Sequence, residues 1–312
     1  MSDGREALLF ERLDGERVRC NLCAHRCLID DGAKGVCLVR ENRGGTLYSL
    51  VYGIPLSQAV DPLEKKPLFH FYPGSTAFSI ATVGCNFRCS FCQNASISQM
   101  PRDQGKIVGH QASPEEVVRA AKRYGSRSIA YTYSEPTIFF EYSYEIARLA
   151  HEAEIASVYV TNGYMTPEML ELFSGIINGH DRWLHGANVD LKAFRDETYL
   201  KVCGARLQPV LDSLKKMKEL GIWVEVTTLV VPGMNDSEDE LREIAQFISG
   251  ELGPETPWHV SRFHPDYKMR DRGPTPTTTL REAYDLGRAA GLHYVYVGNL
   301  PGARLEDSYC PA

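Results

Sequence analysis

Three cysteines stand close together in the segment GCNFRCSFCQN, residues 84–94, with the spacing Cys85-x3-Cys89-x2-Cys92. Thiolates bind zinc and iron–sulfur clusters, and a four-iron cluster normally takes four of them. Three thiolates on one loop leave one iron open, and an open metal position indicates chemistry. We expect Cys85, Cys89 and Cys92 to be catalytic metal ligands. The alternatives are zinc with a distant fourth ligand and three structural cysteines.

Four more cysteines form a second group, Cys20-x2-Cys23-x3-Cys27-x9-Cys37. Four thiolates can close a tetrahedral zinc site or complete a conventional four-iron cluster, and the spacing does not choose between them. We expect His25, which lies inside this group, to be exposed and to have no required role. Cys203 and Cys310 stand alone, and we assign Cys310 no role.

The 312-residue chain has a formal net charge of −6, which argues against nucleic acid or an anionic membrane as a partner. Its first residues mix charges of both signs with short apolar pairs, unlike a secretory signal or transit peptide. No apolar run approaches the roughly 20 residues of a membrane helix. We therefore expect a cytoplasmic protein, in which nine cysteines indicate metal or redox chemistry before disulfides.

The elements that would hold these residues follow a βαβ pattern from residue 76 onward, typical of a parallel sheet. The predicted strands are 77–83, 128–134, 157–162, 187–193, 223–231 and 258–264, with 294–299 as an extra candidate. Six βα units are fewer than a closed eight-stranded barrel needs. We expect an α/β fold with a partial (β/α)6 TIM-like barrel over 76–312, a ligand at the carboxyl ends of its strands, and a small cysteine-rich module over 1–75.

Polar residues stand at the ends of four of these strands. Each group also has a structural explanation: a helix-start carboxylate, a turn, a strand-end salt bridge or a structural histidine. Asp190 and Lys192 share one face of their strand because strand side chains alternate. The residues, in chain order, are Ser134, Glu135, Thr161, Asn162, Asp190, Lys192 and His264.

The three-cysteine spacing, with Phe91 before the last cysteine, resembles the signature of the radical S-adenosylmethionine (SAM) enzymes. The resemblance implies that SAM binds the open iron of a 4Fe-4S cluster. It also implies that one electron cleaves SAM to methionine and a 5′-deoxyadenosyl radical, which abstracts hydrogen from a substrate. Tyr133-Ser134-Glu135-Pro136 resembles the Gly-Gly-Glu-Pro element of this family, whose glutamate binds the methionine ammonium. Here Tyr133 and Ser134 replace the two glycines.

Other strand ends are similar to those of pyruvate formate-lyase activating enzymes. These are the Thr-Asn-Gly turn after Val160, where the activating enzymes carry Asp, the Asp190-Leu191-Lys192 run, and His264. By this resemblance the polar residues after the strands, Ser134, Glu135, Thr161, Asn162, Asp190, Lys192 and His264, bind SAM.

The N-terminal cysteines, followed by LEKKPLFH (63–70) and YPGS (72–75), resemble the radical SAM member of the AmmeMemoRadiSam system. That resemblance implies Memo-like and AMMECR1-like proteins as partners, with a ferredoxin or flavodoxin as electron donor. Two alternatives stay open. The first is an activase that acts on a glycine of a partner protein. The second is a non-enzymatic iron–sulfur electron carrier, which would not require the polar strand ends.

Overall fold

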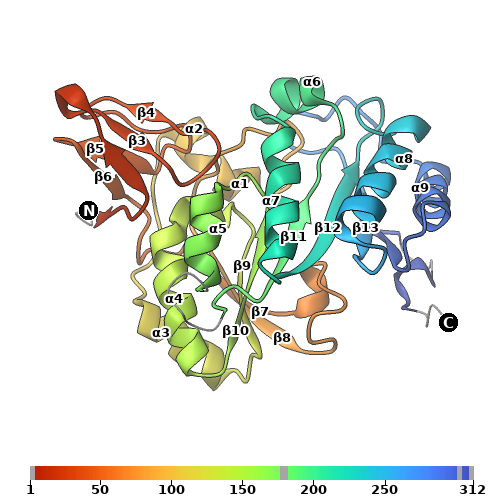
Figure 1. Ribbon diagram of the computed structural model, residues 1–312, viewed down its shortest axis with the longest axis horizontal. Coiled ribbons are helices and arrows are strands. Elements are labelled where there is room, and N and C mark those ends of the chain that lie inside the picture. The colour runs from red at the N-terminus through yellow and green to blue at the C-terminus, as the bar shows by residue number, and fades with distance from the viewer. Residues whose placement is uncertain (1–3, 176–181, 301–303, 309–312) are drawn as a thin grey trace.

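The computed structural model describes residues 4–175, 182–300 and 304–308, so Cys310 lies outside the described residues. Its main feature is an eight-stranded sheet in the order β14-β13-β12-β11-β10-β9-β8-β7 (Figure 1). The strands β8 to β14 pair in parallel, and β7 pairs antiparallel with β8. The bounds are β7 Ser57–Pro62, β8 Thr76–Ala81, β9 Ser128–Tyr131, β10 Ala156–Thr161, β11 Gly186–Asp190, β12 Trp223–Val230, β13 Trp258–Arg262 and β14 Val295–Gly298.

The predicted parallel α/β sheet is confirmed, and the extra strand predicted at 294–299 is present as β14. Within the described residues the sheet stays open, because β14 and β7 are its two different edges. The edge strand β7 lies inside the range 1–75 that we expected to form the separate module. Its alternating half-buried and exposed residues pair along the whole of β8.

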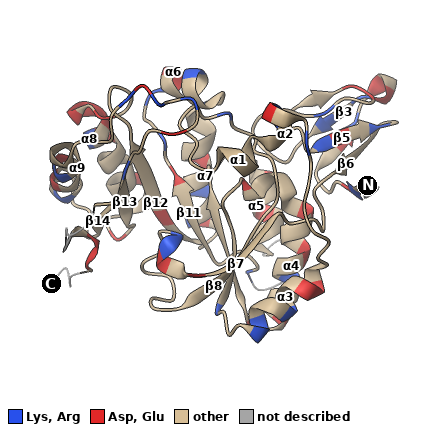
Figure 2. Ribbon diagram, turned by 180° about the vertical axis from the view of Figure 1, so that it is seen from behind, with Lys and Arg blue, Asp and Glu red and all other residues tan. Residues whose placement is uncertain are grey.

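Helices cover one face of the sheet, and the view from behind in Figure 2 shows the strands in front of them. Most charged residues belong to the helices and loops, and few belong to the central strands. The helices are α1 Ala95–Ser98, α2 Met100–Gln104, α3 Pro114–Arg123, α4 Phe140–Glu152, α5 Pro167–Ser174, α6 Asp196–Thr198, α7 Gln208–Glu219, α8 Glu238–Phe247 and α9 Thr277–Ala289. Among the described helices, none is long and apolar enough to cross a membrane.

Serine residues cap the starts of α3 and α8, and each has a glutamate three residues later, the pattern of a capping box. At α3 the capping box is complete, because Ser113 Oγ accepts a hydrogen bond from Glu116 N and the Glu116 carboxylate accepts one from Ser113 N. At α8 only half of the box forms. Ser237 Oγ accepts from Glu240 N, but Glu240 Oε1 accepts from the backbone of Phe194 at 2.6 Å. This carboxylate therefore ties α8 to the loop after β11.

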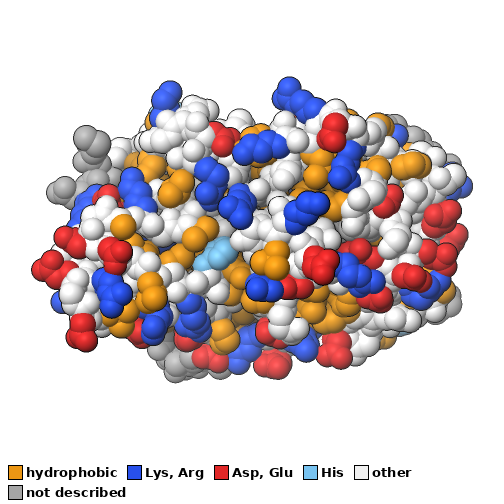
Figure 3. All heavy atoms as spheres, turned by 90° about the horizontal axis from the view of Figure 1, so that it is seen from above, with side chains coloured by type: hydrophobic (Ala, Val, Ile, Leu, Met, Phe, Trp, Pro, Cys, Tyr) orange, Lys and Arg blue, Asp and Glu red, His pale blue; other side chains and the backbone are white. Residues whose placement is uncertain are grey.

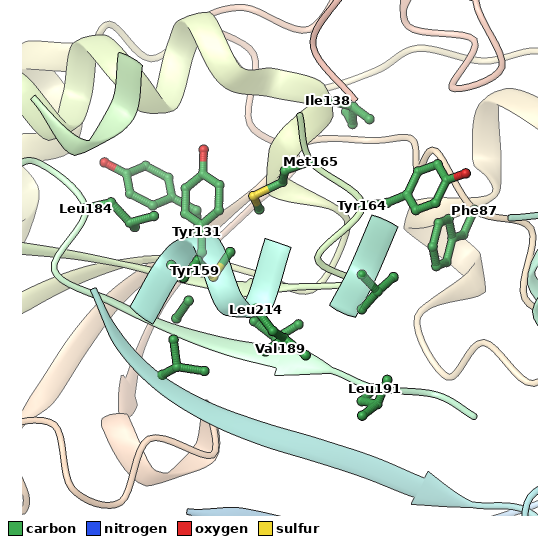
Figure 4. Close-up of a cluster of buried hydrophobic side chains, with 14 of the residues drawn as sticks. Phe87, Tyr131, Ile138, Tyr159, Tyr164, Met165, Leu184, Val189, Leu191 and Leu214 are labelled. Carbon is green, nitrogen blue, oxygen red and sulfur yellow. The ribbon is translucent and has the colours of Figure 1, made fainter. Parts of the chain in front are cut away.

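The core lies between the sheet and its helices, and Figure 4 shows part of it. Tyr131 and Tyr159, from neighbouring strands, are fully buried with ring centroids 5.3 Å apart. Tyr159 also packs edge-on against Phe173 of α5. Each such side chain contributes roughly 1.5–3 kcal/mol on burial, so this layer holds the strand ends in place.

The N-terminal module consists of two small antiparallel sheets, β1-β6-β5 and β2-β3-β4. Their strands are β1 Arg5–Glu6, β2 Phe10–Arg12, β3 Val18–Cys20, β4 Leu28–Ile29, β5 Arg40–Arg43 and β6 Thr46–Ser49. The module lies beside α4 and α5 in Figure 1. A buried ion pair joins it to α4, because both guanidinium Nη atoms of Arg40 donate to the Glu141 carboxylate at 2.7 Å.

Candidate functional site

The three-cysteine loop begins directly after β8 and turns at Gly84, which has a φ of +106°. A Cβ on Gly84 would lie 2.8 Å from Val39 Cγ1, so the close approach of the module requires glycine here. The loop is also held by backbone bonds, since Arg88 N donates to Cys203 O at 2.9 Å and Ser90 N to Val202 O at 3.2 Å. These two carbonyls belong to the π-helix Tyr199–Cys203.

The three thiols open onto one cavity of about 290 Å³ at the carboxyl ends of the parallel strands. Figure 3 looks onto this end of the molecule, where Lys and Arg side chains gather over the middle of the face. The predicted site residues that line the cavity are Cys85, Cys89, Cys92, Ser134, Glu135, Thr161, Asn162, Asp190 and Lys192. His264 does not line it and is exposed.

Glu135 is the most heavily hydrogen-bonded carboxylate of the cavity. Its Oε1 accepts from Thr137 N, Thr137 Oγ1 and Thr161 Oγ1, at 2.6–3.0 Å. Within the described residues, its Oε2 accepts only from Asn162 N, at 2.8 Å. A carboxylate oxygen has about two acceptor sites, so Oε2 retains room for one more donor. Burial raises the pKa of Glu135, although these hydrogen bonds oppose the rise.

The residues before Glu135 keep a glycine-like backbone. Tyr133 has a φ of +65°, a left-handed conformation that costs a non-glycine residue of order 1–3 kcal/mol. Its side chain compensates, because Tyr133 Oη donates to Asp61 Oδ2 and Lys66 Nζ lies 4.2 Å from the ring centroid. Ser134 is buried, and its Oγ has no hydrogen-bond partner in the described part of the chain. An orphaned hydroxyl beside a cavity fits a polar ligand.

Thr161 and Asn162 connect Glu135 to the three-cysteine loop. Gly163 must remain glycine, since its φ is +68° and a Cβ would lie 2.7 Å from Val189 Cγ1. The Asn162 amide donates to Asn86 Oδ1 at 2.7 Å, and its Nδ2 lies 3.8 Å from Cys85 Sγ. The strand end therefore contacts the side chain next to the first cysteine.

Asp190 and Lys192 form the ion pair that their spacing suggested, with Nζ 2.8 Å from Oδ2. Although burial alone would lower the pKa of Lys192, Asp190 and the nearby Cys89 raise it, so the side chain stays charged. The pair also lines the cavity, so the salt bridge and a ligand contact are compatible. Lys192 Nζ lies 5.8 Å from the centroid of the Phe91 ring.

Burial raises the pKa of the Cys85 and Cys92 thiols. For Cys89, contact with the buried thiol of Cys203 is the first cause of a raised pKa, and burial is the second. Ligand thiolates must lose their protons, so binding of a metal group here would release protons. Within the described residues, no three His, Cys, Asp or Glu side chains are grouped for a single metal ion.

The other four cysteines line one small pocket between the module and the barrel. Its further lining residues include His25, Arg40, Asn86 and Ile138. His25 is half-buried and its Nε2 donates to Asn86 O at 2.8 Å, so the expectation of an exposed residue is wrong. Burial lowers the pKa of His25.

Several residues of the site carry no clear signal in the sequence. Ser98 Oγ lies 3.1 Å from Cys92 Sγ, and Lys66 reaches the cavity from the segment before β8. Asn86 lies inside the cysteine motif, but its residue type and position there do not predict a role. A larger hollow of about 420 Å³, lined by residues such as His70 and Trp223, holds no cysteine, so its size does not make it the site.

The donor set fits the group that the three-thiolate loop suggests: three thiols on one loop, an orphaned hydroxyl and a carboxylate with spare acceptor capacity, all on one cavity. The strand ends supply these groups in chain order.

An uncharacterized Methanocaldococcus jannaschii protein, MJ0808, is 48% identical over 98% of this chain and 89% of its own. The pyruvate formate-lyase-activating enzyme of Clostridium pasteurianum is 26% identical over 60% of this chain and 80% of its own. Among solved structures, Streptococcus suis SuiB bound to S-adenosylmethionine shares the fold, with a TM-score of 0.56 at 13% identity, covering 80% of this chain and 56% of that one. The model of the Radical SAM superfamily matches residues 79–248, and the chain therefore belongs to this superfamily of enzymes, which use SAM and a 4Fe-4S cluster.

Proposed function

We propose that Cys85, Cys89 and Cys92 hold a 4Fe-4S cluster in this enzyme, and that the cavity beside them binds SAM. When bound, the cluster and SAM supply a 5′-deoxyadenosyl radical that abstracts hydrogen from a substrate yet to be identified. The observation that carries this proposal is the shared cavity, which brings the three thiols together with polar residues from the ends of β9, β10 and β11.

The strand-end residues then have separate tasks. Glu135 Oε2 is the acceptor for the methionine ammonium, because Oε1 is already occupied by three protein donors. The orphaned Ser134 hydroxyl hydrogen-bonds the same end of SAM. Thr161 and Asn162 hold the Glu135 carboxylate in place, and Asp190 with Lys192 contacts the ribose and carboxylate of SAM. His264 is exposed, so a part for it near the nucleoside requires movement of the loop after β13.

The further assignments rest on resemblance. The four N-terminal cysteines form a second metal site, for zinc or an iron–sulfur cluster, in a module that docks on the barrel. Membership of the AmmeMemoRadiSam system, with Memo-like and AMMECR1-like proteins as partners, is part of this proposal because the N-terminal pattern resembles that of its radical SAM member. The electron donor is a ferredoxin or flavodoxin in the cytoplasm. The Lys and Arg side chains over the cavity end of the molecule favour an acidic partner of this kind (Figure 3).

A glycyl-radical activase is the second candidate. The similarity to the Clostridium pasteurianum activating enzyme favours it, and the open sheet leaves an edge for a protein loop. A glycine-centred electron paramagnetic resonance (EPR) signal on a coexpressed partner would support it. Membership of an enzyme superfamily argues against the simple electron carrier.

Anaerobic reconstitution tests the main proposal. After dithionite and SAM are added, mass spectrometry should detect 5′-deoxyadenosine. Cys89→Ser should abolish it, while the control Ser113→Ala, at the N-cap of α3 and away from the cavity, should retain it. An intact cluster that yields no 5′-deoxyadenosine, or equal activity in Cys89→Ser, would refute the assignment.

A further inference from the structure

A segment between two strands covers the face of the sheet that the helices leave free. Residues 63–75 join β7 to β8, and in Figure 2 this segment lies in front of the strands. Its side chains Leu63 and Leu68 pack on residues of β8, β9 and β10, namely Ala77, Ala130 and Val158. Two positions further along β9 and β10, Thr132 and Val160 line the proposed SAM cavity. The segment therefore forms the floor of that cavity.

Buried side chains of the sheet hold this segment in place by hydrogen bonds. Asn188 Nδ2 donates to Pro67 O at 2.8 Å. Glu225 is completely buried, and its carboxylate accepts from Phe69 N at 3.0 Å and from His70 N at 2.8 Å. These bonds fix the backbone directly after the two lysines that precede Pro67.

Lys66, the second of these lysines, is a buried cation that lines the cavity. Its side chain is 3% exposed, and its Nζ donates to Asp61 Oδ2 at 2.8 Å and to Tyr133 Oη at 3.1 Å. An ammonium has three N–H donors, so one is left over in the described part of the chain. Burial lowers the pKa of Lys66, and Asp61 opposes this fall without cancelling it. An anion beside Nζ would satisfy the third donor and offset the cost of burying the charge.

Positive charge exceeds negative charge on this side of the cavity. Lys65 also lines it, and Lys65 Nζ lies 3.6 Å from Asp61 Oδ1. The two ammonium groups thus share the single carboxylate of Asp61. The acidic neighbour Glu64 does not line the cavity, and its Oε1 accepts from Gly74 N at 2.6 Å. Among the residues that the structure describes, Lys65 and Lys66 therefore leave a positive charge unmatched at the cavity floor.

SAM has partners for its polar groups elsewhere in the same cavity. Under the proposed function, Glu135 accepts the ammonium, while Asp190 and Lys192 contact the ribose and the carboxylate. Lys65 and Lys66 come from the segment after β7 and not from the ends of β9, β10 and β11. Their charge is thus available to a second ligand. Because SAM occupies part of the cavity of about 290 Å³, the group that enters beside it must be small.

We propose that Lys66, assisted by Lys65, binds a carboxylate or phosphate group of the substrate, so that the enzyme acts on a small organic anion. This inference rests on the proposed function and adds the substrate class. The lysines bind and orient the anion, and no bond forms or breaks at either of them. An ammonium on a fixed segment is already ordered before the substrate arrives, which favours tight binding. A backbone glycine of a partner protein carries no anionic group, so this site favours a small anion over the glycyl-radical activase.

Inorganic phosphate is the probe of the first test, measured by isothermal titration calorimetry on the reconstituted protein. Lys66→Met should weaken phosphate binding by about tenfold, because a hydrogen bond to a charged group is lost. Lys65→Met should weaken it less, since that side chain is 68% exposed. Asp61→Asn should instead strengthen it severalfold, because two lysines then lack their carboxylate. Lys122→Met, an exposed lysine on α3, is the matched control and should bind phosphate like the wild type.

The opposite signs separate binding from a structural role. A pair that only supported the fold would make Lys66→Met and Asp61→Asn change phosphate binding in the same direction, which would overturn the inference. Lys66→Met also leaves Asp61 without its nearest cation, and a folding defect can mimic a lost site. The double variant Asp61→Asn/Lys66→Met removes both charges, and it should bind phosphate as weakly as Lys66→Met. Wild-type affinity in the double variant would refute the site.

Competition with SAM distinguishes the two anions that a lysine here can bind. In the wild type, phosphate and SAM should bind at the same time, because the substrate and SAM share the cavity. If phosphate displaced SAM in proportion to its concentration, Lys66 would hold the SAM carboxylate. The substrate assignment would then be wrong.

The second test follows the substrate itself. A small-molecule extract of cells that naturally produce the protein is divided on an anion-exchange column, and each fraction is added with SAM and dithionite. The retained, anionic fraction should raise 5′-deoxyadenosine formation above the basal rate. This stimulation should fall by about tenfold in Lys66→Met. Stimulation by the unretained fraction alone would refute an anionic substrate.

The two proposals fail separately. If the wild type binds phosphate through Lys66 but forms no 5′-deoxyadenosine with dithionite, the proposed function is wrong. If it forms 5′-deoxyadenosine but Lys66→Met binds phosphate like the wild type, only the lysine site is wrong.

Discussion

The two cysteine groups are built in opposite ways. The three-cysteine loop faces a cavity of about 290 Å³ and is surrounded by polar groups from three strand ends, one of them an orphaned hydroxyl. The four-cysteine pocket is small and lies at the contact between module and barrel, next to a buried ion pair. An open position needs ligand-binding groups around it. A closed metal site needs only a well-packed interface. The three-cysteine loop meets the first requirement and the four-cysteine pocket meets the second.

The largest effect should come from the ion pair beside the closed site. Arg40→Met leaves the Glu141 carboxylate buried without its cation, which typically costs about 3–5 kcal/mol. Urea unfolding of the reconstituted protein should show this loss. Arg26→Met removes an exposed pair with Glu168 across the same interface and should cost less than about 1 kcal/mol. Equal effects of the two variants would mean that the buried pair does not anchor the module.

At the open site, Glu135→Gln should weaken SAM binding by roughly 10- to 100-fold, because hydrogen bonds to a charged group are worth about 1.5–3 kcal/mol. The amide also replaces one acceptor by a donor facing Thr161, Thr137 or Asn162. The measurement is the dissociation constant of SAM, from its effect on the EPR signal of the reduced cluster. Thr161→Val removes a single neutral donor to Glu135 and should weaken the free energy of SAM binding by about 1 kcal/mol. If Glu135→Gln bound SAM like the wild type, the ammonium would have to bind elsewhere.

These two sites also mark what the sequence could predict. The polar strand-end residues were expected to lie together because parallel strands bring their carboxyl ends to one edge of the sheet. Each of these polar residues except His264 lines the cavity. His264 lies beyond the last residue of β13, where the loop and not the sheet sets its direction. The strand β14 was predicted from the βαβ pattern of the sequence.

The contacts around the four-cysteine pocket join residues that are far apart in the sequence, so no local pattern predicts them. Arg40 and Glu141 are 101 positions apart, and His25 and Asn86 are 61 apart. Each residue, taken alone, is an ordinary charged or polar side chain. The edge strand β7 was missed because it precedes the βαβ repeat and pairs in the opposite direction. Only packing of the whole chain reveals these pairs.

A smaller effect should follow from Tyr133→Phe, which tests how the open site tolerates a side chain in a left-handed conformation. The variant keeps the ring but removes the hydroxyl that bonds Asp61 and Lys66. We expect a loss of about 1 kcal/mol in stability and a severalfold rise in the SAM dissociation constant. Tyr48→Phe, on the module strand β6, is a matched control far from the cavity in sequence. A variant that binds SAM more tightly would show that the hydroxyl does not support the Glu135 backbone.

The smallest effect should be a difference in acid sensitivity. Although burial alone would raise it, the Arg40 cation and its hydrogen bonds lower the pKa of Glu141 in the folded protein. A carboxyl group with a lowered folded pKa contributes stability above its unfolded pKa, about 4.3, and loses that contribution as pH falls through the folded value. Wild-type stability should therefore fall with pH below about 4.3 more steeply than that of the double variant Arg40→Met/Glu141→Leu, in which the titrating group is gone. Urea midpoints of both proteins, stripped of metal and measured from pH 6 to pH 3, compare the slopes. If the urea midpoints of the two proteins fell in parallel with pH, other carboxylates would account for the loss of stability in acid. The ion pair would then only orient the module on the sheet.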